Sequence, residues 1–416
     1  MIEIQSSLKF QNLEAKTGRH QKIICILDTT DSTELFKELA QIRGDKGNGE
    51  DNRVLFRCLM AFMVFGVSHI AQGRRLLDED RVLREIVGIG AWGKIPSCDS
   101  FYRFIKRLCK EPCQEALREM FVKLVRELKE ILPGFGQHLA GDSTKLHSYA
   151  RGSKVSVDTD ASWKKQKKIM KNPMGNITES FEKWFGYKAH ILSDANYELP
   201  IGFVTTTAKH NDNTIFPELW EKTKSEQSWI LTETKYVGLD MGYDDGKIYE
   251  QLSIADEIIP IIKIRDMVRE ENKDIDLSAP PVCENNLALT FNGYERKRKQ
   301  IRYIKPTTCV GIPCPFYKNC FIGVKRVSIE QDPRKLIPIP RNTKKFERLS
   351  HKRVSIERVN SRLKEHYNLD GMRRYGLKET NLMVNLSLIC MNAFALCIAR
   401  KGHIKEVRRI YTALAA

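Results

Sequence analysis

The chain changes character after Gly136, and this change constrains its fold more than any other feature. Before it, apolar patterning predicts helices, such as a buried helix over residues 54–70 and a longer one that starts at Ser97 or Asp99 and runs to Ile131. After it, short apolar runs alternate with helical segments in the order β-β-β-α-β-α-β. The sequence therefore predicts an α/β fold, a mixed sheet with helices that follows an all-helical N-terminal domain.

This reading divides the chain into five parts. The helical part has two interpretations, a helix-turn-helix that binds DNA ends or an ordinary helical domain. Within the second part, the basic stretch WKKQKKIMKNPMGN is expected to be a loop, and in the third a hairpin is expected around Asn292-Gly293. The parts are the helical N-terminal region 1–135, the first sheet segment 136–275, a basic Cys-containing insertion 276–324, the second segment of the sheet domain 325–400 and a basic tail 401–416.

The charge balance favours a polyanionic partner. The 416 residues carry a net charge of +17, with a pI near 9.3. The first residues lack an apolar signal segment, and the scattered cysteines suit a reducing cytosol. The apolar stretch 382–399 contains Asn385, Ser387 and Asn392, so we expect a buried core helix and no membrane association.

Two aspartates follow apolar runs that predict strands. Asp142 is expected at the end of the first strand and Asp240 at the end of a later one, before an acidic loop. Carboxylates that converge at a sheet edge suit two Mg²⁺ ions about 4 Å apart, which cut phosphodiesters. The alternative is that each is an ordinary loop or cap aspartate, and a shift of register would make Asp244 or Asp245 the ligand instead.

A third carboxylate lies on a helix rich in cations. At about 100° per residue, Arg353, Glu357, Asn360 and Lys364 fall on one stripe beside an apolar flank. Such a helix can offer a metal ligand together with phosphate-binding cations. The other interpretation is an amphipathic helix with an ion pair between Arg353 and Glu357.

Taken together, these motifs resemble the DDE transposases of bacterial insertion sequences, close to the groups called IS4, IS5 and IS1182. The family signature of Tyr, two residues, Arg, three residues, Glu, six residues and Lys is matched at Arg353, Glu357 and Lys364, with Ser350 in place of the Tyr. GDSTKLH and LDMGYDD are similar to the segments around the two family aspartates, and FGYKAHILSD and TTTAKHND to its strands. The resemblance covers about residues 136–275 and 325–400.

The resemblance implies a ribonuclease-H-like fold whose metal ligands are Asp142, Asp240 and Glu357, with Mg²⁺ or Mn²⁺ bound. It also implies that Arg353 and Lys364 hold DNA phosphates, that transposon ends and target DNA are the partners, and that a homodimer forms in a synaptic complex in the bacterial cytoplasm or nucleoid. Ser350 puts one DNA contact in doubt.

Two further features concern metal and DNA. Cys283, Cys309, Cys314 and Cys320 gather in the insertion, either as a zinc site or as unligated thiols. The basic run before the Glu helix, with Lys344 and Lys345, is the best further candidate for DNA contact, beside the Asn360 of the stripe.

The function that these features predict is a transposase that cleaves and joins transposon-end DNA with Mg²⁺. One alternative is a metal-dependent nuclease that cuts without strand transfer. Another is a transposase-derived DNA-binding protein that has lost catalysis. A third is a zinc-stabilised structural or RNA-binding protein.

Overall fold

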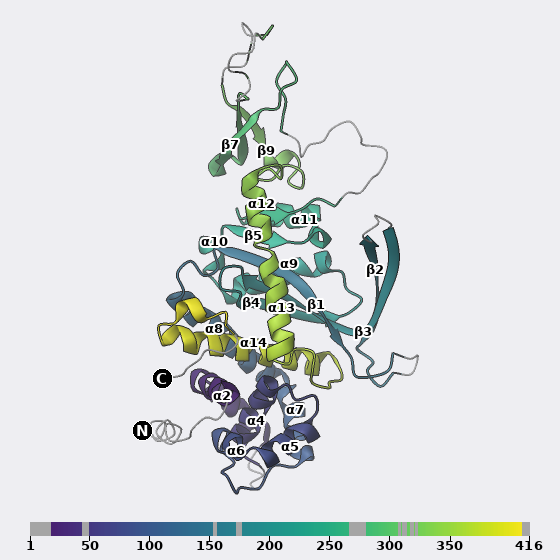
Figure 1. The fold of residues 1–416 in the computed structure, drawn as a ribbon, viewed down its shortest axis with the longest axis vertical. Coiled ribbons are helices and arrows are strands. Elements are labelled where there is room, and N and C mark those ends of the chain that lie inside the picture. The colour runs from purple at the N-terminus through teal and green to yellow at the C-terminus, as the bar shows by residue number, and fades with distance from the viewer. Residues whose placement is uncertain are drawn as a thin grey trace.

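The computed structural model describes residues 18–43, 50–152, 156–171, 177–265, 280–306, 309, 314–316, 320 and 323–409. Figure 1 shows an elongated molecule with helices at one end, a sheet in the middle and a small β unit at the other end. The N-terminal helices are α2 Gly18–Thr29, α3 Thr33–Arg43, α4 Asn52–Phe65, α5 Ile70–Glu79, α6 Arg81–Val87, α7 Cys98–Leu108 and α8 Glu111–Ile131.

Local signals explain where these helices begin and end. Gly66 closes α4 in a left-handed conformation, which costs glycine little. Ser97 caps α7 by accepting a hydrogen bond from the Ser100 amide. The single long helix expected up to Ile131 is wrong, because the chain breaks after Leu108 and α8 restarts with a proline in its first turn.

The central sheet runs in the order β2-β3-β1-β5-β6, and β4 also pairs with β3. β1 is antiparallel to β3, β3 is antiparallel to β2 and β4, and β5 is parallel to β1 and β6. The strands are β1 His138–His147, β2 Ser162–Lys171, β3 Ile177–Asp194, β4 Pro200–Thr207, β5 Tyr236–Leu239 and β6 Ile259–Ile262.

Two expectations about strands need correction. The basic stretch expected to be a loop begins as β2, which pairs along its whole length with the first half of β3. β1 continues past Asp142 to His147 because the long β3 supplies partners that far, so Asp142 lies inside a strand and not at its end. The predicted hairpin of β3 and β4 is confirmed.

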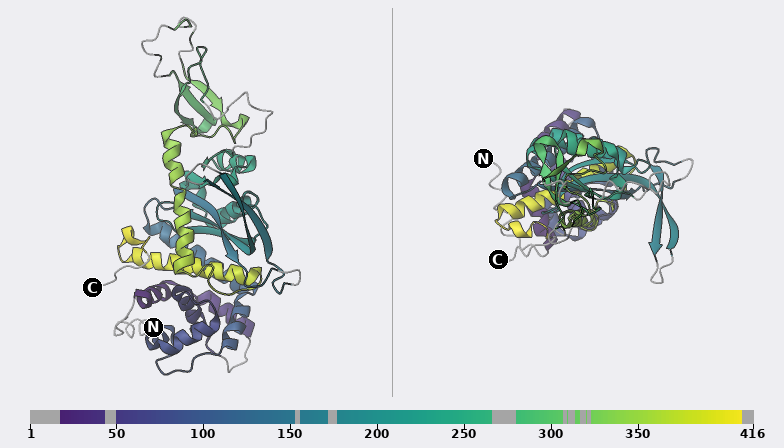
Figure 2. Two further views of the ribbon diagram at one scale, coloured as in Figure 1. Left: turned by 45° about the vertical axis from the view of Figure 1, so that its right-hand side comes forward. Right: turned by 90° about the horizontal axis from the view of Figure 1, so that it is seen from above.

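Helices pack on this sheet and connect it to the N-terminal region. α9 Asp212–Glu226 contacts β3 and β4, while α13 Val354–His366 contacts β1 and β3. Figure 2 shows α13 standing along the sheet and α14 Leu377–Arg400 crossing beneath it. The remaining helices of this part are α10 Ile230–Glu233, α11 Gly246–Tyr249 and α12 Lys344–His351.

α14 is the central core helix of the molecule. Within the described residues it is the one single helix that is long and apolar enough to span a bilayer, and α4 with α5 would qualify only as a sharply bent pair. Nearly every residue of α14 after Thr380 is buried, against α8, α2 and β4. Asn392 donates to the Pro200 carbonyl at 3.0 Å, and Ser387 donates to the Met383 carbonyl. The prediction of a buried core helix is confirmed.

The insertion has a small core of its own. Strands β7 Thr290–Glu295, β8 Gln300–Ile304 and β9 Lys325–Ser328 form a separate antiparallel sheet. The turn between β7 and β8 lies at residues 296–299 and not at Asn292-Gly293, which instead forms an irregularity in β7. The core of this unit consists of Leu289, Ile301, Tyr303, Ile329 and Leu336.

Candidate active site

Asp142 and Asp240 come from neighbouring parallel strands in matching register. β1 pairs with β5 at an offset of 98 residues, through His138 with Tyr236 and onward to Ala140 with Gly238. The same offset separates Asp142 from Asp240. Adjacent strands lie about 5 Å apart, so continuing this register by two residues places the two aspartates side by side on one face.

Both aspartates are set in place by short backbone hydrogen bonds. The Ser143 amide donates to Asp142 Oδ1 at 2.7 Å, and the Gly242 amide donates to Asp240 Oδ1 at 2.7 Å. The second bond caps the short 3₁₀ turn Met241–Tyr243 that follows β5. The acidic loop after β5 therefore begins with a fixed carboxylate and not with a mobile one.

The electrostatics of the pair favour a cation. Burial, and to a lesser extent the neighbouring charge of Asp240, raise the pKa of Asp142 to about 7. Burial also raises the pKa of Asp240. Two buried carboxylates that resist ionisation side by side are the hard oxygen donors that a divalent cation stabilises, so the residues fit Mg²⁺ or Mn²⁺.

The helix with the third carboxylate crosses the sheet close to this pair. A Cβ on Gly238 would lie 3.7 Å from the Arg353 Cβ, so the start of α13 passes directly over β5. The positive charge of Arg353 opposes part of this rise, because it lowers the pKa of both aspartates. Arg353 Nη2 donates to Glu357 Oε1 at 2.7 Å. The helix begins only after Arg353, because α12 ends at His351 and a short turn separates the two helices.

Glu357 is held by Arg353 and half of its side chain is exposed. Among the described residues, no three His, Cys, Asp or Glu side chains gather as a metal-binding cluster. The structure therefore brings together Asp142 and Asp240. It places Glu357 on the overlying helix, but the three carboxylates do not meet around one position as metal ligands would.

The other predicted residues of the helix stripe are partly covered. Lys364 donates to the Lys145 carbonyl on β1 at 2.9 Å, and burial lowers its pKa. Asn360 is only 9% exposed, and its Oδ1 accepts no hydrogen bond from the described residues. The C-terminal half of the stripe thus faces the sheet, while Arg353 and Glu357 lie nearer the surface.

Lys344 and Lys345 lie exposed at the start of α12. Lys344 lines an open cavity of about 420 Å³ together with Lys263, Arg341 and His351. Ser350, which stands in place of the family Tyr, lines the same cavity. Most residues that line this basic hollow come directly before α13, the helix that carries Glu357.

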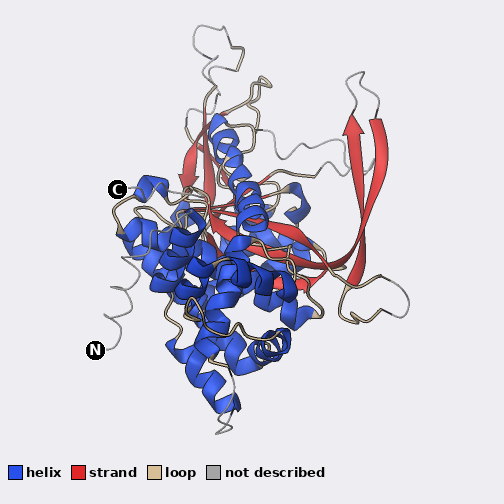
Figure 3. Cartoon of the chain, turned by 60° about the horizontal axis from the view of Figure 1, so that its bottom comes forward, coloured by secondary structure: helices blue, strands red, loops and turns tan. Residues whose placement is uncertain are grey.

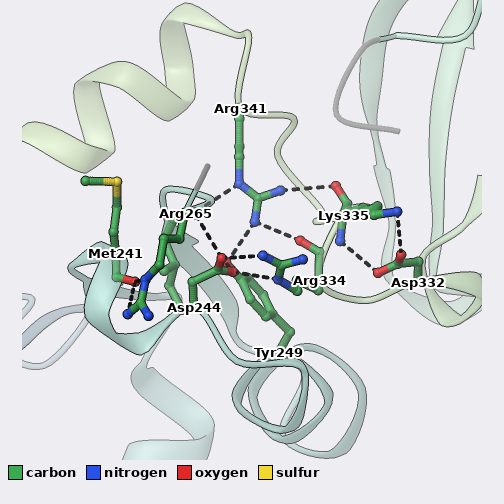
Figure 4. A network of polar contacts seen from close by, with 9 residues as sticks. Met241, Asp244, Tyr249, Arg265, Asp332, Arg334, Lys335 and Arg341 are labelled. Atoms are coloured by element: carbon green, nitrogen blue, oxygen red, sulfur yellow. Dashed lines mark hydrogen bonds and ion pairs between the residues drawn. The ribbon is translucent and has the colours of Figure 1, made fainter. Parts of the chain in front are cut away.

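Asp244 and Asp245 are engaged elsewhere. Figure 4 shows Asp244 accepting hydrogen bonds from Arg334, at 2.6 and 3.0 Å, and from the hydroxyl of Tyr249. Although burial acts in the opposite direction, these bonds hold the pKa of Asp244 below its ordinary value. Asp245 caps α11 and accepts from Asn213 at 2.9 Å. Asp244 thus joins the central sheet to the segment that returns from the insertion.

One residue near the pair was missed in the sequence. Asp212, the first residue of α9, raises the pKa of both Asp142 and Asp240 by its charge. Lys188 Nζ lies 2.6 Å from its Oδ1, and the ring of His190 lies 3.7 Å away. The TTTAKHND segment, which ends in Asp212, was the available signal, but its aspartate carried no assigned role.

The four cysteines of the insertion line one cavity. Cys283, Cys309, Cys314 and Cys320 all face a hollow of about 330 Å³ beside the small core. They come from separate loops, so the tertiary fold brings residues up to 37 positions apart to one place. Within the described part of the chain they do not form a metal-binding cluster.

The strand order β4-β3-β1-β5-β6, with Asp142 in β1 and Asp240 directly after the parallel strand β5, is that of a ribonuclease-H-like fold. The model of the Transposase DDE domain family matches residues 133–393, well over half of the chain, so the chain belongs to that family. No curated protein matches. A piggyBac transposase, solved in a synaptic complex with hairpin DNA, is similar at 12% identity and a TM-score of 0.39, covering 94% of this chain and 77% of that one.

Proposed function

We propose that this transposase uses Asp142, Asp240 and Glu357 to cleave transposon-end DNA with Mg²⁺ or Mn²⁺ and to join the freed end to target DNA. The observation that carries the proposal is the matched register of Asp142 and Asp240 beneath a helix that presents Arg353 and Glu357. The bound cations supply Lewis-acid stabilisation of the phosphoryl oxygens and of the leaving oxyanion.

The roles of the side chains follow from their positions. Asp142 and Asp240 provide oxygen ligands that are already oriented by backbone amides, so little reorganisation is needed. Glu357 would complete the ligand set, for which it would have to give up its contact with Arg353. Arg353 is then available to hold a DNA phosphate, with Lys364 and Asn360 further along the helix.

The reaction has two displacement steps. In the first, a water oxygen attacks the phosphorus at the element end, the bond to the 3′-oxygen breaks, and the 3′-oxygen leaves and takes up a proton. In the second, this 3′-hydroxyl attacks a phosphorus of the target and releases a target 3′-hydroxyl. A nuclease without strand transfer performs only the first step, and a DNA-binding relative performs neither.

The test uses labelled DNA that carries the gene with its flanking ends. Wild-type protein is expected to nick this DNA with Mg²⁺ and not in EDTA, while Asp142→Ala, Asp240→Ala and Glu357→Ala are inactive. Glu250→Ala, at an exposed carboxylate away from the strand ends, is the matched control and retains activity. Full activity of all three variants would contradict the assignment of these carboxylates as the metal ligands. Joined products with a target plasmid separate a transposase from a nuclease.

The partners follow from the same chemistry. Two ends must be held together for concerted joining, so we propose a homodimer on DNA, acting in the cytoplasm. The exposed Lys344 and Lys345 beside the basic hollow are proposed to contact end DNA. Light scattering with and without end DNA measures the assembly, and a monomer that cleaves and joins both ends would contradict the dimer.

The four cysteines around one cavity support a further proposal, a structural zinc ion in the insertion. Thiolates are the ligands that zinc prefers, and a small unit with a five-residue core gains stability from such a crosslink. This zinc is separate from the catalytic cations.

A further inference from the structure

β2 and the half of β3 that pairs with it form an arm that projects from the body of the molecule. Figures 1 and 3 show these two strands standing away from the helices and from the rest of the sheet. β2 has β3 as its partner, and nothing in the described chain pairs with its other edge. The arm is built from the basic stretch that the sequence had suggested to be a loop.

The two faces of the arm differ. On one face, Trp184 is buried, and Lys145 of β1 lies over its ring at 4.6 Å and pairs with Glu182 at 2.6 Å. On the same face, Lys164 donates to Asn211 at 2.6 Å. This face is therefore attached to the body of the protein.

The opposite face is largely exposed; near the body it alternates rings with ammonium groups, and the carboxylate of Glu179 lies further out on the same face. Trp163 and Phe181 are 54% and 55% exposed, although they are among the largest apolar side chains. Trp163 lies opposite Phe185, with ring centroids 5.5 Å apart, and Lys165 lies opposite Lys183. Successive rows on one face of a strand are about 7 Å apart. We call this set, Trp163, Lys165, Phe181, Lys183 and Phe185, the aromatic–basic face.

The lysine pair is unfavourable in the isolated protein. Lys165 and Lys183 are directly cross-strand neighbours, and like charges in that position destabilise a sheet. Lys165 Nζ lies 3.7 Å from the centre of the Phe181 ring, which compensates only part of this repulsion. An anion between the two ammonium groups would remove the repulsion.

A similar combination lies at the foot of the arm. Tyr149 and Tyr375 are half exposed with rings 5.9 Å apart, and Arg373 lies over Tyr149 at 4.1 Å. A Cβ on Gly152 would lie within 2.4 Å of the Trp163 ring, so the segment after Tyr149 packs against the arm. Aromatic rings with adjacent cations therefore continue from the arm onto the body.

We infer that the aromatic–basic face binds an unpaired DNA strand, whose bases stack on Trp163 and Phe181 while its phosphates contact Lys165 and Lys183. This inference deepens the proposed function, on which it rests for its DNA substrate. Rings beside cations are the standard platform for single strands. In a duplex the base faces are covered by their neighbours and cannot stack on a protein ring. A second copy of the chain would bring the same lysines together and increase the repulsion.

The experiment measures binding without cleavage. Fluorescein-labelled dT20 and a 20-base-pair duplex are titrated with full-length protein in EDTA, and Kd is read from anisotropy. Trp163→Ala/Phe181→Ala is expected to weaken dT20 binding by about 30-fold or more, from the loss of two stacked bases, with less than about threefold change for the duplex. Trp163→Phe/Phe181→Tyr keeps the rings and is expected to retain binding.

The charge variant gives a second readout. Lys165→Glu/Lys183→Glu is expected to lower dT20 affinity and to reduce the slope of log K against log salt by about 1 to 2. The matched control is Leu231→Ala/Lys235→Glu, an exposed apolar residue and an exposed lysine near the start of β5. It is expected to bind dT20 like the wild type.

Each outcome decides the inference. Unchanged dT20 affinity in both arm variants overturns it, and so does an equal loss for dT20 and duplex. A change in the sedimentation of the DNA-free protein would make the face a self-association surface instead. Circular dichroism confirms that the variants are folded. Asp142→Ala is expected to bind dT20 normally, so a failure of the proposed catalysis and a failure of the arm are separate results.

Discussion

Arg353 Nη2 lies 2.7 Å from Glu357 Oε1, one turn along the helix that crosses the sheet. The same arginine lowers the pKa of Asp142 and Asp240 by its charge, so one cation serves all three carboxylates. The charge of Arg353 acts on these carboxylates in the same direction as the charge of a bound divalent cation would. Binding of a metal and of a DNA phosphate would then release Glu357 and Arg353 from each other.

Arg353→Ala is expected to reduce DNA cleavage on the order of 100-fold, because a phosphate-binding cation and the anchor of Glu357 are both lost. Since the arginine lowers the pKa of both aspartates, its removal raises them, and the acid limb of the pH–rate profile is expected to move to higher pH. Single-turnover cleavage from pH 5.5 to 8.5 measures both effects. Lys235→Ala, at an exposed cation just before β5, is the control, and an unchanged profile for Arg353→Ala would contradict the shared role.

Asp142→Asn is expected to stabilise the metal-free protein at pH 8 by about 1 to 3 kcal/mol. The pKa of Asp142 is raised to about 7 in the fold, above an unfolded value of about 3.9, so the native state binds the extra proton between these values. The free energy of unfolding therefore falls as the pH rises from about 3.9 to about 7. Above about pH 7 Asp142 is ionised in both states, and no further stability is lost. At pH 5, near the lower end of this window, only part of this cost is present, so the stabilisation by Asp142→Asn should be clearly smaller than at pH 8.

Urea unfolding in EDTA at pH 5 and pH 8 measures this difference. Asp78→Asn, at an exposed carboxylate of α5, should change stability little at either pH. Equal stabilisation by Asp142→Asn at both pH values would show that ionisation is not its cause.

Glu198→Ala is expected to destabilise the fold by about 2 to 3 kcal/mol. Glu198 is buried in the turn between β3 and β4, at φ 56°, and it accepts from Arg358 at 2.7 Å and from Arg362 at 3.2 Å on the outer side of α13. Its loss leaves the largely buried Arg362 with only carbonyl partners. Urea unfolding measures the loss, and Glu406→Ala, which breaks an exposed pair with Arg409, should cost less than about 1 kcal/mol.

Asp244→Ala and Arg334→Ala are each expected to cost about 2 to 4 kcal/mol, because each leaves a buried or half-buried partner unpaired. The double variant should cost less than the sum, with a coupling energy above about 1 kcal/mol. Denaturant unfolding of the four proteins gives the cycle. Additive losses would contradict a direct pair, and loss of Mg²⁺ binding in Asp244→Ala alone would restore Asp244 as a ligand.

Purified protein is expected to contain one zinc per chain, measured by elemental analysis after dialysis against metal-free buffer. Cys283→Ser and Cys314→Ser should each lose it, because a tetrahedral site needs all four thiolates. Cys98→Ser, at a partly exposed cysteine of α7, is the control. Zinc-free wild-type protein that unfolds at the same temperature as the zinc-loaded protein would leave the four cysteines as plain thiols.

Local patterns were sufficient for several parts of the fold. The alternation of apolar residues predicted the β3–β4 hairpin, and the polar residues within 382–399 identified a core helix, since both depend on short-range periodicity. Sequence patterns gave a wrong prediction where pairing with a distant strand determines the secondary structure. The basic stretch before Ile177 reads as a loop, yet it becomes β2 because β3 is long enough to pair with it.

The sequence by itself determined the residues of the candidate site and the family, because spacing within a strand or a helix turn is local information. The spacing in the sequence places Glu357 one helical turn after Arg353, and the motifs around Asp142 and Asp240 can be identified without the fold. Only the tertiary structure decided that an offset of 98 residues aligns Asp142 with Asp240, and that Asp244 is engaged by Arg334. These outcomes depend on strand pairing and on packing between distant segments. Burial in the folded protein then raises the pKa of Asp142 and Asp240, a change that the sequence alone does not reveal.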